Sequence, residues 1–437
     1  MEQNEILRLA VTDTNENGVG IARHEGMVVF VPGLLAGEEA DVRITSLEKN
    51  YAAGICLCRQ NNAPERIADD CPSADVCGGC TLGFTTYEHE NRIKENTVRA
   101  ALRRAGLCDS RVRTTVSAPE RCFYRNKIVV HYDAASASFG FVRAESNDPI
   151  PFAGCLLAPP AVSRIIRYAN GHPALFSPLS PTELHLRTAP AGITLSLYAG
   201  TADRDAFSVC RDALTGAFDE ISDVLLFPTQ KSAASKTSAP VYIRDRIAGL
   251  DMRFTSEAFR QVNTPAFEKL LGIVHDFAAE KPFSCAADLY CGSGIIGLSL
   301  AKRFPDARFW GIEINPDAVR DAKLNAEHNG LANITFFCGD AATFRTRLGR
   351  KEHPELLVVD PPRAGLSKEM RRGLLSLSPE RIIYVSCNPQ TMARDLAALC
   401  ASDGNSPAYE LREAVPVNMF PRTKHCETVA WLTRKDA

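Results

Sequence analysis

From about residue 254 onward the chain alternates short apolar runs with longer amphipathic stretches, and this alternation restricts the fold more than any other feature. The successive runs read CAADLY, GIIGLSLAKRF, RFWGIEI, PDAVRDAKLNAEHNG, ITFFCGD, ELLVVD, KEMRRGLLSL, RIIYVSC and PQTMARDLAALC. Strands that alternate with helices in this way predict a parallel, doubly wound α/β sheet. Ligands of such sheets bind at the carboxyl ends of the strands, so functional side chains are expected at that edge.

A glycine-rich turn follows the first of these strands. Gly292, Gly294 and Gly297 in CGSGIIG satisfy the spacing G-x-G-x-x-G, and Glu313 closes the next strand about twenty residues later. The glycines let the backbone approach a nucleotide, and a carboxylate at the second strand end accepts hydrogen bonds from ribose hydroxyls. Taken alone, this pattern fits an NAD-linked oxidoreductase as well as an enzyme that uses S-adenosylmethionine.

Two more carboxylates stand at the ends of the third and fourth strands. They are Asp340 in FFCGDAA and Asp360 in VVDPPRAG. Each could simply cap a following helix, a position that aspartate favours. The whole series of strand-end residues resembles that of class I, Rossmann-like methyltransferases, which implies that Asp288 and Tyr290 line the cofactor loop.

The stretch IIYVSCNPQ ends a predicted strand at a cysteine. Cys387 would lie at the ligand edge, just before a helix beginning near Pro389, whose dipole is expected to favour the thiolate. The alternative is a packed thiol, because free cysteine is among the most buried residue types. Near the C-terminus, MFPRTKHCETVAWL supplies the carboxyl group of Glu427, with His425 two residues before it.

The residues after the fourth strand indicate which atom is methylated. Methyltransferases that act on exocyclic amines often carry Asn-Pro-Pro-aromatic there, whereas this chain has Asp360-Pro361-Pro362-Arg363. Carbon 5 of a pyrimidine is a poor nucleophile until a thiolate adds to carbon 6, which is covalent catalysis. A base must then remove the carbon 5 proton. Cys387 and Glu427 could supply these two functions.

Four motifs together resemble the RNA uracil-5-methyltransferases: SCNP at 386–389, MFPRTKHCE at 419–427, SEAFRQVN at 256–263 and YRNKI at 124–128. The resemblance implies that Cys387 is the nucleophile and Glu427 the proton acceptor, with YRNKI near the substrate base. Cys426 has no role in this pattern and is expected to be a packed thiol. The resemblance also implies a set of residues that contact S-adenosylmethionine: Gln261, Tyr290, Ile295, Glu313, Asp340 and Asp360.

A cysteine-rich turn at 71–80 has the spacing C-x5-C-x2-C, formed by Cys71, Cys77 and Cys80, and Cys155 could add a fourth thiolate. Four soft ligands suit zinc or an iron-sulfur cluster, and the spacing does not choose between them. The resemblance to the large-subunit ribosomal RNA branch of the family implies a [4Fe-4S] cluster.

The chain divides into three predicted domains. Residues 1–60 read as short strands with glycine turns and resemble a TRAM domain, a small OB-like β-barrel. Residues 61–252 form a central α+β domain expected to bind the cluster and RNA, whose helical part at about 83–117 could pack on the catalytic domain. Residues 253–437 form the methyltransferase domain. The small polar stretch at 229–240 is expected to be a loop tip or flexible insertion.

Charge and composition indicate the compartment and the partner. No secretion signal follows Met1, no run of 18 apolar residues occurs, and the cysteine count of 15 is odd, so a cytoplasmic protein without a disulfide framework is expected. Ten Lys or Arg between Arg92 and Lys127, against three acids, form either a solvated helix face or a phosphate-binding surface.

The interpretation that unites these features is a monomeric enzyme, with no membrane partner, that methylates carbon 5 of a uridine in 23S rRNA. The alternatives are a tRNA uracil-5-methyltransferase, which would share the catalytic pair, and a non-catalytic iron-sulfur RNA-binding protein. The ribosomal branch is preferred because the bacterial tRNA branch generally lacks both the TRAM domain and the cysteine cluster.

Overall fold

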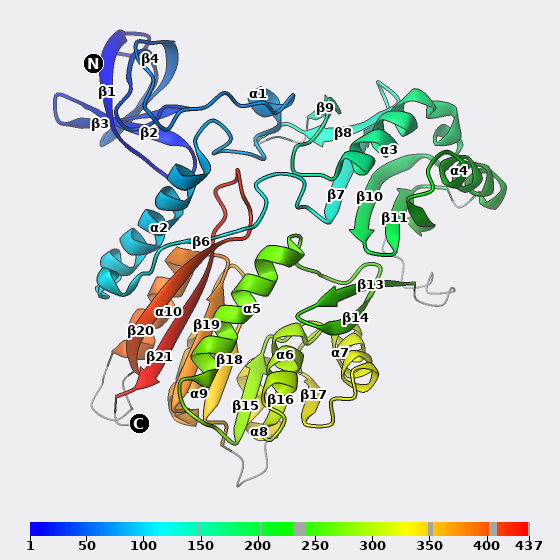
Figure 1. Ribbon diagram of the computed structural model, residues 1–437. Helices are drawn as coiled ribbons and strands as arrows, with labels where there is room; N and C mark the ends of the chain where they lie inside the picture. The colour runs from blue at the N-terminus through cyan, green and yellow to red at the C-terminus, as the bar shows by residue number, and fades with distance from the viewer. Residues whose placement is uncertain are drawn as a thin grey trace.

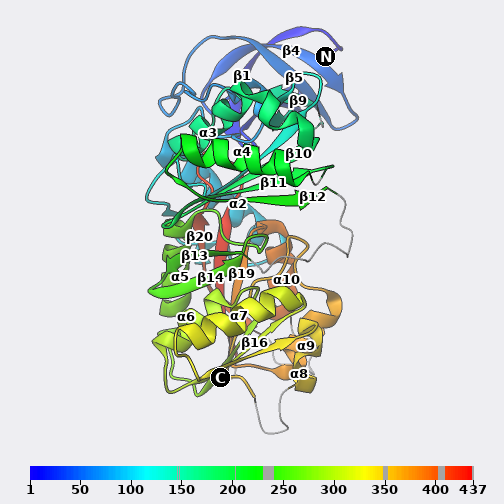
Figure 2. The same ribbon diagram turned by 90° about the vertical axis from the view of Figure 1, so that its right-hand side faces the viewer.

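The computed structural model describes residues 1–144, 146, 148–201, 203–229, 241–347, 353–401 and 409–435 (Figure 1). The predicted loop tip at 229–240 lies outside these ranges, apart from Thr229. A barrel and a central sheet stand side by side above a larger sheet that holds the C-terminus (Figures 1 and 2). Across the described residues, no helix combines the length and the apolarity needed to cross a membrane.

The N-terminal strands close into a five-stranded barrel of order β1-β2-β3-β5-β4. The strands are β1 (Ile6–Thr14), β2 (Val19–His24), β3 (Met27–Pro32), β4 (Glu39–Leu47) and β5 (Tyr51–Arg59). Alternate side chains point inward, as the period of a strand requires. Val42 and Ile44 of β4, for example, pack with Leu9 and Val11 of β1 in the barrel core. The prediction of a small N-terminal β-barrel is confirmed.

The central domain is a six-stranded sheet with two helices on one face, which confirms the predicted α+β class. Its strand order is β12-β11-β10-β7-β8-β9. The strands are β7 (Lys127–Asp133), β8 (Ser138–Val142), β9 (Pro149–Pro151), β10 (Pro181–Ala189), β11 (Gly192–Ala199) and β12 (Ile221–Pro228). The helices α3 (Pro160–Gly171) and α4 (Arg204–Ala217) lie on the face turned toward the viewer in Figure 2. Two short 3-10 turns, η2 (Pro173–Leu175) and η3 (Ser177–Leu179), precede β10.

The C-terminal sheet has eight strands in the order β17-β16-β15-β18-β19-β21-β20-β6. Their bounds are β15 (Cys285–Leu289), β16 (Arg308–Glu313), β17 (Ile334–Cys338), β18 (Leu356–Val359), β19 (Arg381–Ser386), β20 (Tyr409–Asn418), β21 (Glu427–Arg434) and β6 (Val116–Ser117). The five strands from β17 to β19 are parallel, and β21 joins β19 in the antiparallel sense. Every residue of β18 and β19 is buried, as expected of a parallel sheet covered on both faces. The predicted doubly wound sheet is confirmed.

Helices cover both faces of this sheet. They are α5 (Thr264–Ala279), α6 (Ile295–Arg303), α7 (Pro316–His328), α8 (Phe344–Arg347), α9 (Lys368–Leu377) and α10 (Pro389–Cys400), with the 3-10 turn η4 (Ala341–Thr343). Side-chain caps start α5, α7, α9 and α10, where Asn263, Asn315, Ser367 and Asn388 accept hydrogen bonds from the first free amides. The hairpin of β13 (Tyr242–Ile247) and β14 (Leu250–Thr255) packs on α7.

A segment from the first third of the chain completes the C-terminal sheet. After the short α1 (Ala74–Cys77), the helix α2 (Tyr87–Arg104) packs against α10 and β20, and η1 (Asp109–Arg111) follows it. The strand β6 then pairs with β20, with Val116 opposite Val417. The helical segment at about 83–117, assigned to the central domain on sequence grounds, therefore lies against the catalytic domain.

Candidate active site

The carboxyl ends of the parallel strands bring the predicted site residues to one edge of the sheet. Neighbouring strands end together, since Leu289 is opposite both Ile312 and Val359, and Val359 is opposite Tyr384. The residues that follow these strands share this edge: Tyr290, Asp340, Asp360 and Cys387.

The turn between β15 and α6 forms a backbone cradle. Gly292 has φ +53° and Gly294 has φ +84°, in the left-handed region that glycine adopts without strain. A Cβ on Gly294 would stand 2.7 Å from Cζ of Phe336, so nothing larger than glycine fits there. Tyr290, at φ +65°, shares this conformation, and the turn ends at Ile295, the first residue of α6.

Asp288 is buried beneath this cradle and holds it in shape. Its Oδ2 accepts a hydrogen bond from the amide of Gly297 at 2.8 Å, while its Oδ1 has no partner among the described residues. Burial raises the pKa of Asp288 to about 8. A buried polar atom without a partner calls for one, and a cofactor that carries amino and hydroxyl groups would supply it. The cradle therefore fits a nucleoside cofactor, a class that includes S-adenosylmethionine.

Two of the predicted cofactor-binding residues, Glu313 and Asp340, also stabilise the backbone. Glu313 accepts hydrogen bonds from the amides of Asn315 at 2.8 Å and Gly292 at 3.2 Å, which ties the end of β16 to the glycine turn. Asp340 caps η4 by accepting from the amide of Ala342 at 2.9 Å, as the capping alternative anticipates. Next to Glu313, Ile314 is 69% exposed, an apolar side chain at the cofactor edge that sequence reasoning missed.

The segment 256–263 is held at the same edge by the motif YRNKI. The side-chain amide of Asn126 donates to the carbonyl of Gln261 at 2.8 Å, and its backbone amide donates to the carbonyl of Val262 at 2.8 Å. The two motifs that are distant in sequence therefore lie together. Phe259, in the same segment, is 78% exposed and free to contact a ligand.

Strand register places the two candidate reactive groups next to each other. Ser386, the last residue of β19, is opposite Thr428 of β21, so continuing this antiparallel register puts Cys387 opposite Glu427. Cys387 is half-buried and Glu427 is 5% exposed. Asn388 then starts α10, accepting a hydrogen bond from the amide of Gln390 at 3.0 Å. Cys426, by contrast, is buried in the core, with its thiol directed at the carbonyl of Glu427.

Acidic groups crowd this end of the strands. Burial raises the pKa of Glu427 to about 8, with a further rise from Asp360, and burial raises the pKa of Asp360 to about 7. Burial also raises the pKa of the Cys387 thiol, and both carboxylates add to that rise. Burial and the two carboxylates therefore oppose the contribution expected from the start of α10, which favours the thiolate.

Arg363 is the cation that opposes the rise in the pKa of the Cys387 thiol. Its guanidinium hydrogen-bonds the thiol of Cys387 and lowers its pKa, and it also lowers the pKa of Glu427. The backbone of Arg363 is anchored, because its carbonyl accepts from Asn388 Nδ2 at 3.2 Å and from Thr391 Oγ1 at 3.1 Å. Sequence reasoning used Arg363 only as a departure from another motif and assigned it no function.

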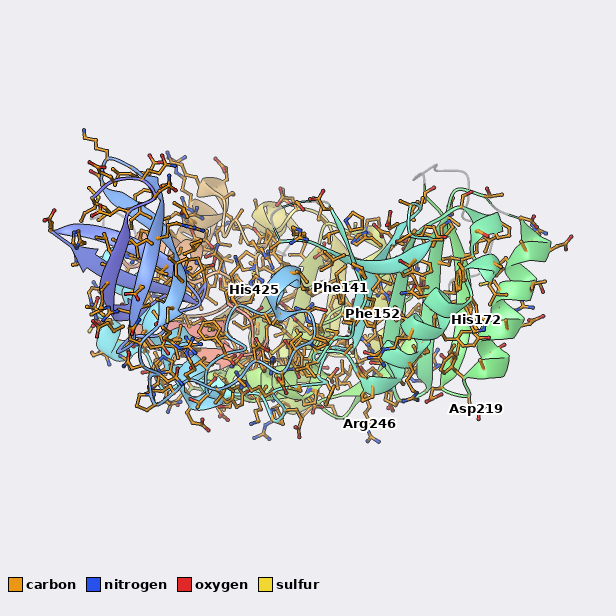
Figure 3. All side chains as sticks on the ribbon, turned by 90° about the horizontal axis from the view of Figure 1, so that it is seen from above. Phe141, Phe152, His172, Asp219, Arg246 and His425 are labelled. Atoms are coloured by element: carbon orange, nitrogen blue, oxygen red, sulfur yellow. The ribbon has the colours of Figure 1, made fainter. Side chains whose placement is uncertain are left out.

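A cavity of about 240 Å³ opens beside Cys387. Its walls come from the β1–β2 turn of the barrel, from α2, from the start of α10 and from the residues before β21: Glu16, Asn17, Thr97, Arg363, Cys387, Asn388, Pro389, Gln390, Lys424, His425 and Cys426. Seen from above, His425 lies between the barrel and Phe141 and Phe152 of the central domain (Figure 3). Burial lowers the pKa of His425 to about 4, so its ring is neutral at ordinary pH.

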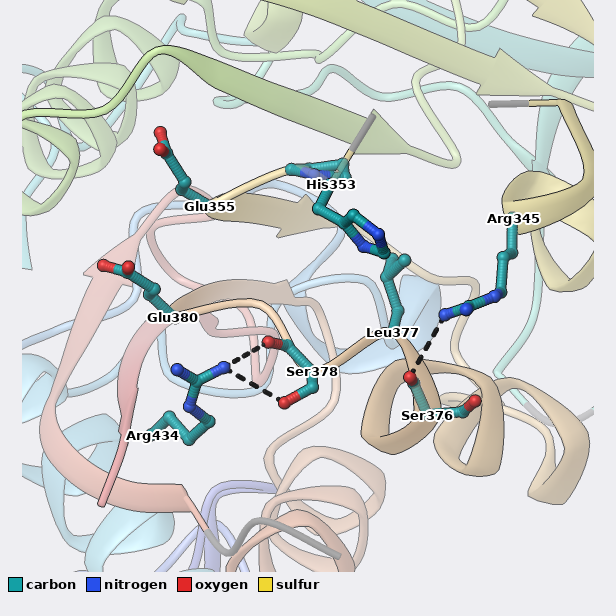
Figure 4. A pocket seen from close by; sticks show the side chains of 9 residues that line it. Arg345, His353, Glu355, Ser376, Leu377, Ser378, Glu380 and Arg434 are labelled. Atoms are coloured by element: carbon teal, nitrogen blue, oxygen red, sulfur yellow. Dashed lines mark hydrogen bonds between the residues drawn. The ribbon is translucent and has the colours of Figure 1, made fainter. Parts of the chain in front are cut away.

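A second cavity, of about 400 Å³, lies at the opposite end of the strands (Figure 4). Glu355 and Glu380 on its wall precede β18 and β19, so it faces the amino ends of the strands. Arg434 donates to the carbonyl of Ser378 at 2.6 Å within it (Figure 4). It is remote from the strand ends that carry Cys387 and the glycine turn, and none of the predicted site residues lines it.

The four predicted cluster cysteines are half-buried free thiols. Cys80 interacts electrostatically with the other three, and burial raises its pKa to about 12. Four such thiols from two distant segments match the ligand type and number of a four-thiolate cluster. Among the described residues, however, no group of three or more His, Cys, Asp or Glu side chains is spaced as a metal site.

Most of the basic segment between Arg92 and Lys127 is neutralised by acids. Seven of its ten cations form ion pairs: Arg92, Lys94, Arg99, Arg103, Arg111, Arg113 and Arg121. The predicted solvated helix face describes Arg103, which is exposed, whereas Lys94 on the same helix is fully buried. A phosphate-binding surface would rely on the other three, Arg104, Arg125 and Lys127, for which the described part of the chain shows no such pair.

Two family models match the chain. Residues 2–57 match the TRAM domain, and residues 241–435 match the family described as tRNA (Uracil-5-)-methyltransferase. The first match covers the barrel, and the second covers β13 through β21.

Relatives matched over nearly their full length agree with these family matches, and a solved structure shares the fold. Proteins described as uncharacterized RNA methyltransferases from Bacillus cereus and Chlorobaculum tepidum are each 30% identical to the chain; the first alignment covers 99% of this chain and 98% of the relative, and the second covers 99% and 97%. The crystal structure of Pyrococcus abyssi tRNA (uracil-54, C5)-methyltransferase with S-adenosyl-L-homocysteine superposes with a TM-score of 0.73. It is 22% identical, and the match covers 98% of this chain and 100% of that one.

Proposed function

The chain belongs to the TRAM-containing RNA uracil-5-methyltransferases, and on this premise we propose that it methylates carbon 5 of a uridine in 23S rRNA, with Cys387 as nucleophile and Glu427 as base. The observation that supports the proposal is the register of β19 and β21, in which Ser386 is opposite Thr428; continued by one residue, this register would bring Cys387 opposite Glu427. A non-catalytic RNA-binding protein would have no use for this pairing.

Bound S-adenosylmethionine would supply an electrophilic methyl group on a sulfonium sulfur. We assign its binding to the cradle of Gly292 and Gly294 with Ile295, to Asp288 and to the other predicted contacts: Gln261, Tyr290, Glu313, Asp340 and Asp360. The uridine must leave its stack to reach this buried edge. Stacking on an exposed ring such as Phe259 would hold neighbouring bases apart.

The residues of the chain would then act in sequence. The Cys387 sulfur bonds to carbon 6, and the electron pair of the 5,6 double bond moves onto carbon 5 and the carbon 4 carbonyl. Carbon 5 attacks the methyl group, and the pair of the broken carbon–sulfur bond stays on the departing thioether. Glu427 removes the carbon 5 proton, the double bond re-forms, and the Cys387 thiolate leaves. Arg363 supports this cycle by offsetting negative charge at the thiolate.

The test is a covalent complex with RNA that contains 5-fluorouridine, from which the base cannot remove fluorine. Wild-type protein with S-adenosylmethionine should form a complex stable to denaturation, and Cys387→Ala should form none. A complex that survives in Cys387→Ala would overturn the assignment, and so would a wild-type protein that traps no RNA.

A tRNA uridine is the second candidate substrate, favoured by the match to a tRNA (Uracil-5-)-methyltransferase model and by the tRNA enzyme among the solved structures. The four cysteines support the ribosomal branch, whereas the barrel does not separate the two candidates, because the match to the tRNA enzyme covers 98% of this chain. Mapping 5-methyluridine in both RNAs of a deletion strain separates them, since the modified position that disappears identifies the substrate.

We also propose that Cys71, Cys77, Cys80 and Cys155 bind a [4Fe-4S] cluster. Their number, type and mutual interaction support it. Iron and sulfide analysis of anaerobically purified protein should give four of each per chain. Stoichiometric zinc without iron would overturn this part.

A further inference from the structure

The loop between β20 and β21, residues 419–426, ends immediately before Glu427 and is called here the base loop. Its backbone is held from outside, because four successive carbonyls accept hydrogen bonds from four separate segments. The pairs, donor first, are Asn263 Nδ2 to Met419 at 3.0 Å, Lys94 Nζ to Phe420 at 3.0 Å, Tyr124 Oη to Pro421 at 3.0 Å and the Leu82 amide to Arg422 at 2.9 Å. The base loop therefore takes its position from its surroundings.

Arg422 is the residue of this loop with an unusual backbone. Its φ is +69°, a left-handed conformation that is strained for a residue with a bulky side chain. The strain is offset by contacts: its amide donates to Glu90 Oε1 at 2.9 Å, and the side chain is almost completely buried. Glu90 is itself buried and pairs with Lys94 at 3.0 Å, so this anchor belongs to a buried ion network on α2.

The guanidinium of Arg422 joins the base loop to the start of the cysteine-rich turn. It pairs with Asp69, whose side chain is 16% exposed, and at 3.1 Å with Asp70, whose side chain is 69% exposed. Asp69 also accepts a hydrogen bond from the amide of Cys71 at 3.1 Å. One carboxylate thus holds both the arginine of the base loop and the first cysteine of the turn.

We propose that Arg422 is a positioning residue for the proton-removal step, and that Asp69 holds it in place from the cysteine-rich turn. This inference rests on the proposed function, because it acts through Glu427. Glu427 follows Arg422 by five residues. Among the described hydrogen bonds from distant segments to the base loop, the last carbonyl to accept one is that of Arg422, and strand pairing begins at Glu427, which is opposite Val417 of β20. Release of the guanidinium would let the start of β21 shift, and a displacement of about 1 Å can slow a catalytic step by about 100-fold.

The cysteine-rich turn would then influence proton removal by Glu427 but not the addition of the Cys387 thiolate. Cys387 is fixed by β19 and by the Asn388 cap of α10, neither of which contacts Asp69 or Arg422 in the contacts described. Addition of the thiolate to carbon 6 should therefore be independent of this ion pair. Removal of the proton from carbon 5 should depend on it.

The two aspartates provide a matched pair of variants. Asp69→Asn removes the less exposed of the two charges but keeps an oxygen that can accept from the amide of Cys71. The buried guanidinium of Arg422 is then left with only the exposed carboxylate of Asp70 as an ionic partner. Asp70→Asn removes the same charge from the exposed neighbour, where an ion pair contributes little. Arg422→Lys keeps the charge and loses the planar fork, which provides a second variant should Asp69→Asn fold poorly.

Two measurements on the same RNA separate the steps. Covalent trapping on 5-fluorouridine RNA reports the Cys387 step, and single-turnover tritium release from RNA with [5-³H]uridine reports proton removal. Asp69→Asn and Arg422→Lys should trap RNA at the wild-type rate and release tritium about 10- to 100-fold more slowly. Asp70→Asn should match wild type in both. Added to Glu427→Gln, Asp69→Asn should cause no further slowing, since both act on one step.

Hydrogen exchange supplies a readout that does not depend on turnover. Amides of residues 419–427 should exchange faster in Asp69→Asn than in Asp70→Asn. Equal slowing of trapping and tritium release, full additivity with Glu427→Gln, or wild-type tritium release in Asp69→Asn would each overturn the inference. Absence of trapping by the wild-type protein would instead refute the proposed function itself.

Discussion

The protonation of Glu427 leads to a quantitative prediction about pH. The carboxyl group must be ionised to accept the carbon 5 proton, yet burial and Asp360 raise its pKa to about 8. At pH 7 only about a tenth of the molecules would hold the carboxylate, against about nine tenths at pH 9. The rate of proton removal should therefore rise roughly tenfold between these pH values, with a midpoint near pH 8.

The assay must separate this group from the thiol, whose pKa is also raised. Single-turnover mixing on [5-³H]uridine RNA would first let the methylated covalent intermediate accumulate at low pH, followed by a jump to the test pH. Tritium release after the jump reports the carboxyl groups at this site without the thiol, because the thiol has already reacted. The formation of the complex with 5-fluorouridine RNA, measured in parallel, reports Cys387.

Release that is independent of pH from 6.5 to 9.5 would refute the reasoning. A midpoint near the ordinary carboxylate value of 4.5 would refute it equally, because it would mean that the buried site does not hold the proton. Either result would mean that the protonation of Glu427 does not control the removal of the carbon 5 proton.

Three further predictions follow from the same site. Between pH 4.5, the ordinary pKa of glutamate, and about pH 8, the folded protein holds a proton on Glu427 that the unfolded chain releases, so stability should fall as pH rises through this window. Between pH 5 and 8, the melting temperature of the wild-type protein should therefore drop more than that of Glu427→Gln. Equal drops in the two proteins would contradict this prediction. In Gly294→Ala the backbone φ of +84° would be strained and the new Cβ would lie 2.7 Å from the Phe336 ring. Calorimetry should therefore show that S-adenosylhomocysteine binds at least about tenfold more weakly. Unchanged affinity would show that the cradle is not the cofactor site. Asn388→Ala should lower the free energy of unfolding by about 1 kcal/mol and also slow covalent trapping, whereas the matched cap variant Ser367→Ala on α9 should have only the first effect.

The parallel sheet and the strand ends that carry Cys387 and Glu427 could be predicted because their signals are local. A strand that ends at Ser386-Cys387-Asn388 is recognisable from its apolar run and its cap, and Glu427 begins a similar run. What the residues alone do not reveal is that the two strands are neighbours in the sheet. That adjacency depends on β21 inserting between β19 and β20, which is decided by packing over the whole sheet.

The parts that escaped prediction are contacts between distant segments. Glu16 and Asn17 reach the cavity from a barrel turn, and nothing in their own sequence marks them. The raised pKa of the Cys387 thiol has a similar origin, because a helix start is visible in sequence whereas burial beside Asp360 and Glu427 is not. Arg363 could have been noticed as a charged residue directly after two prolines at a strand end.

The short strand β6 and helix α2 have a consequence for how the chain is made. Both belong to the first third of the sequence, yet their partners β20 and α10 are among the last elements to be synthesised. During translation the apolar face of α2, including Val98 and Leu102, remains uncovered until the C-terminal elements have been synthesised. A fragment beginning near residue 253 would lack these elements. It would expose one edge of β20, which could then pair with strands of other molecules and cause aggregation. The catalytic unit is thus assembled from both ends of the chain at once, and it cannot be cut free as a contiguous piece.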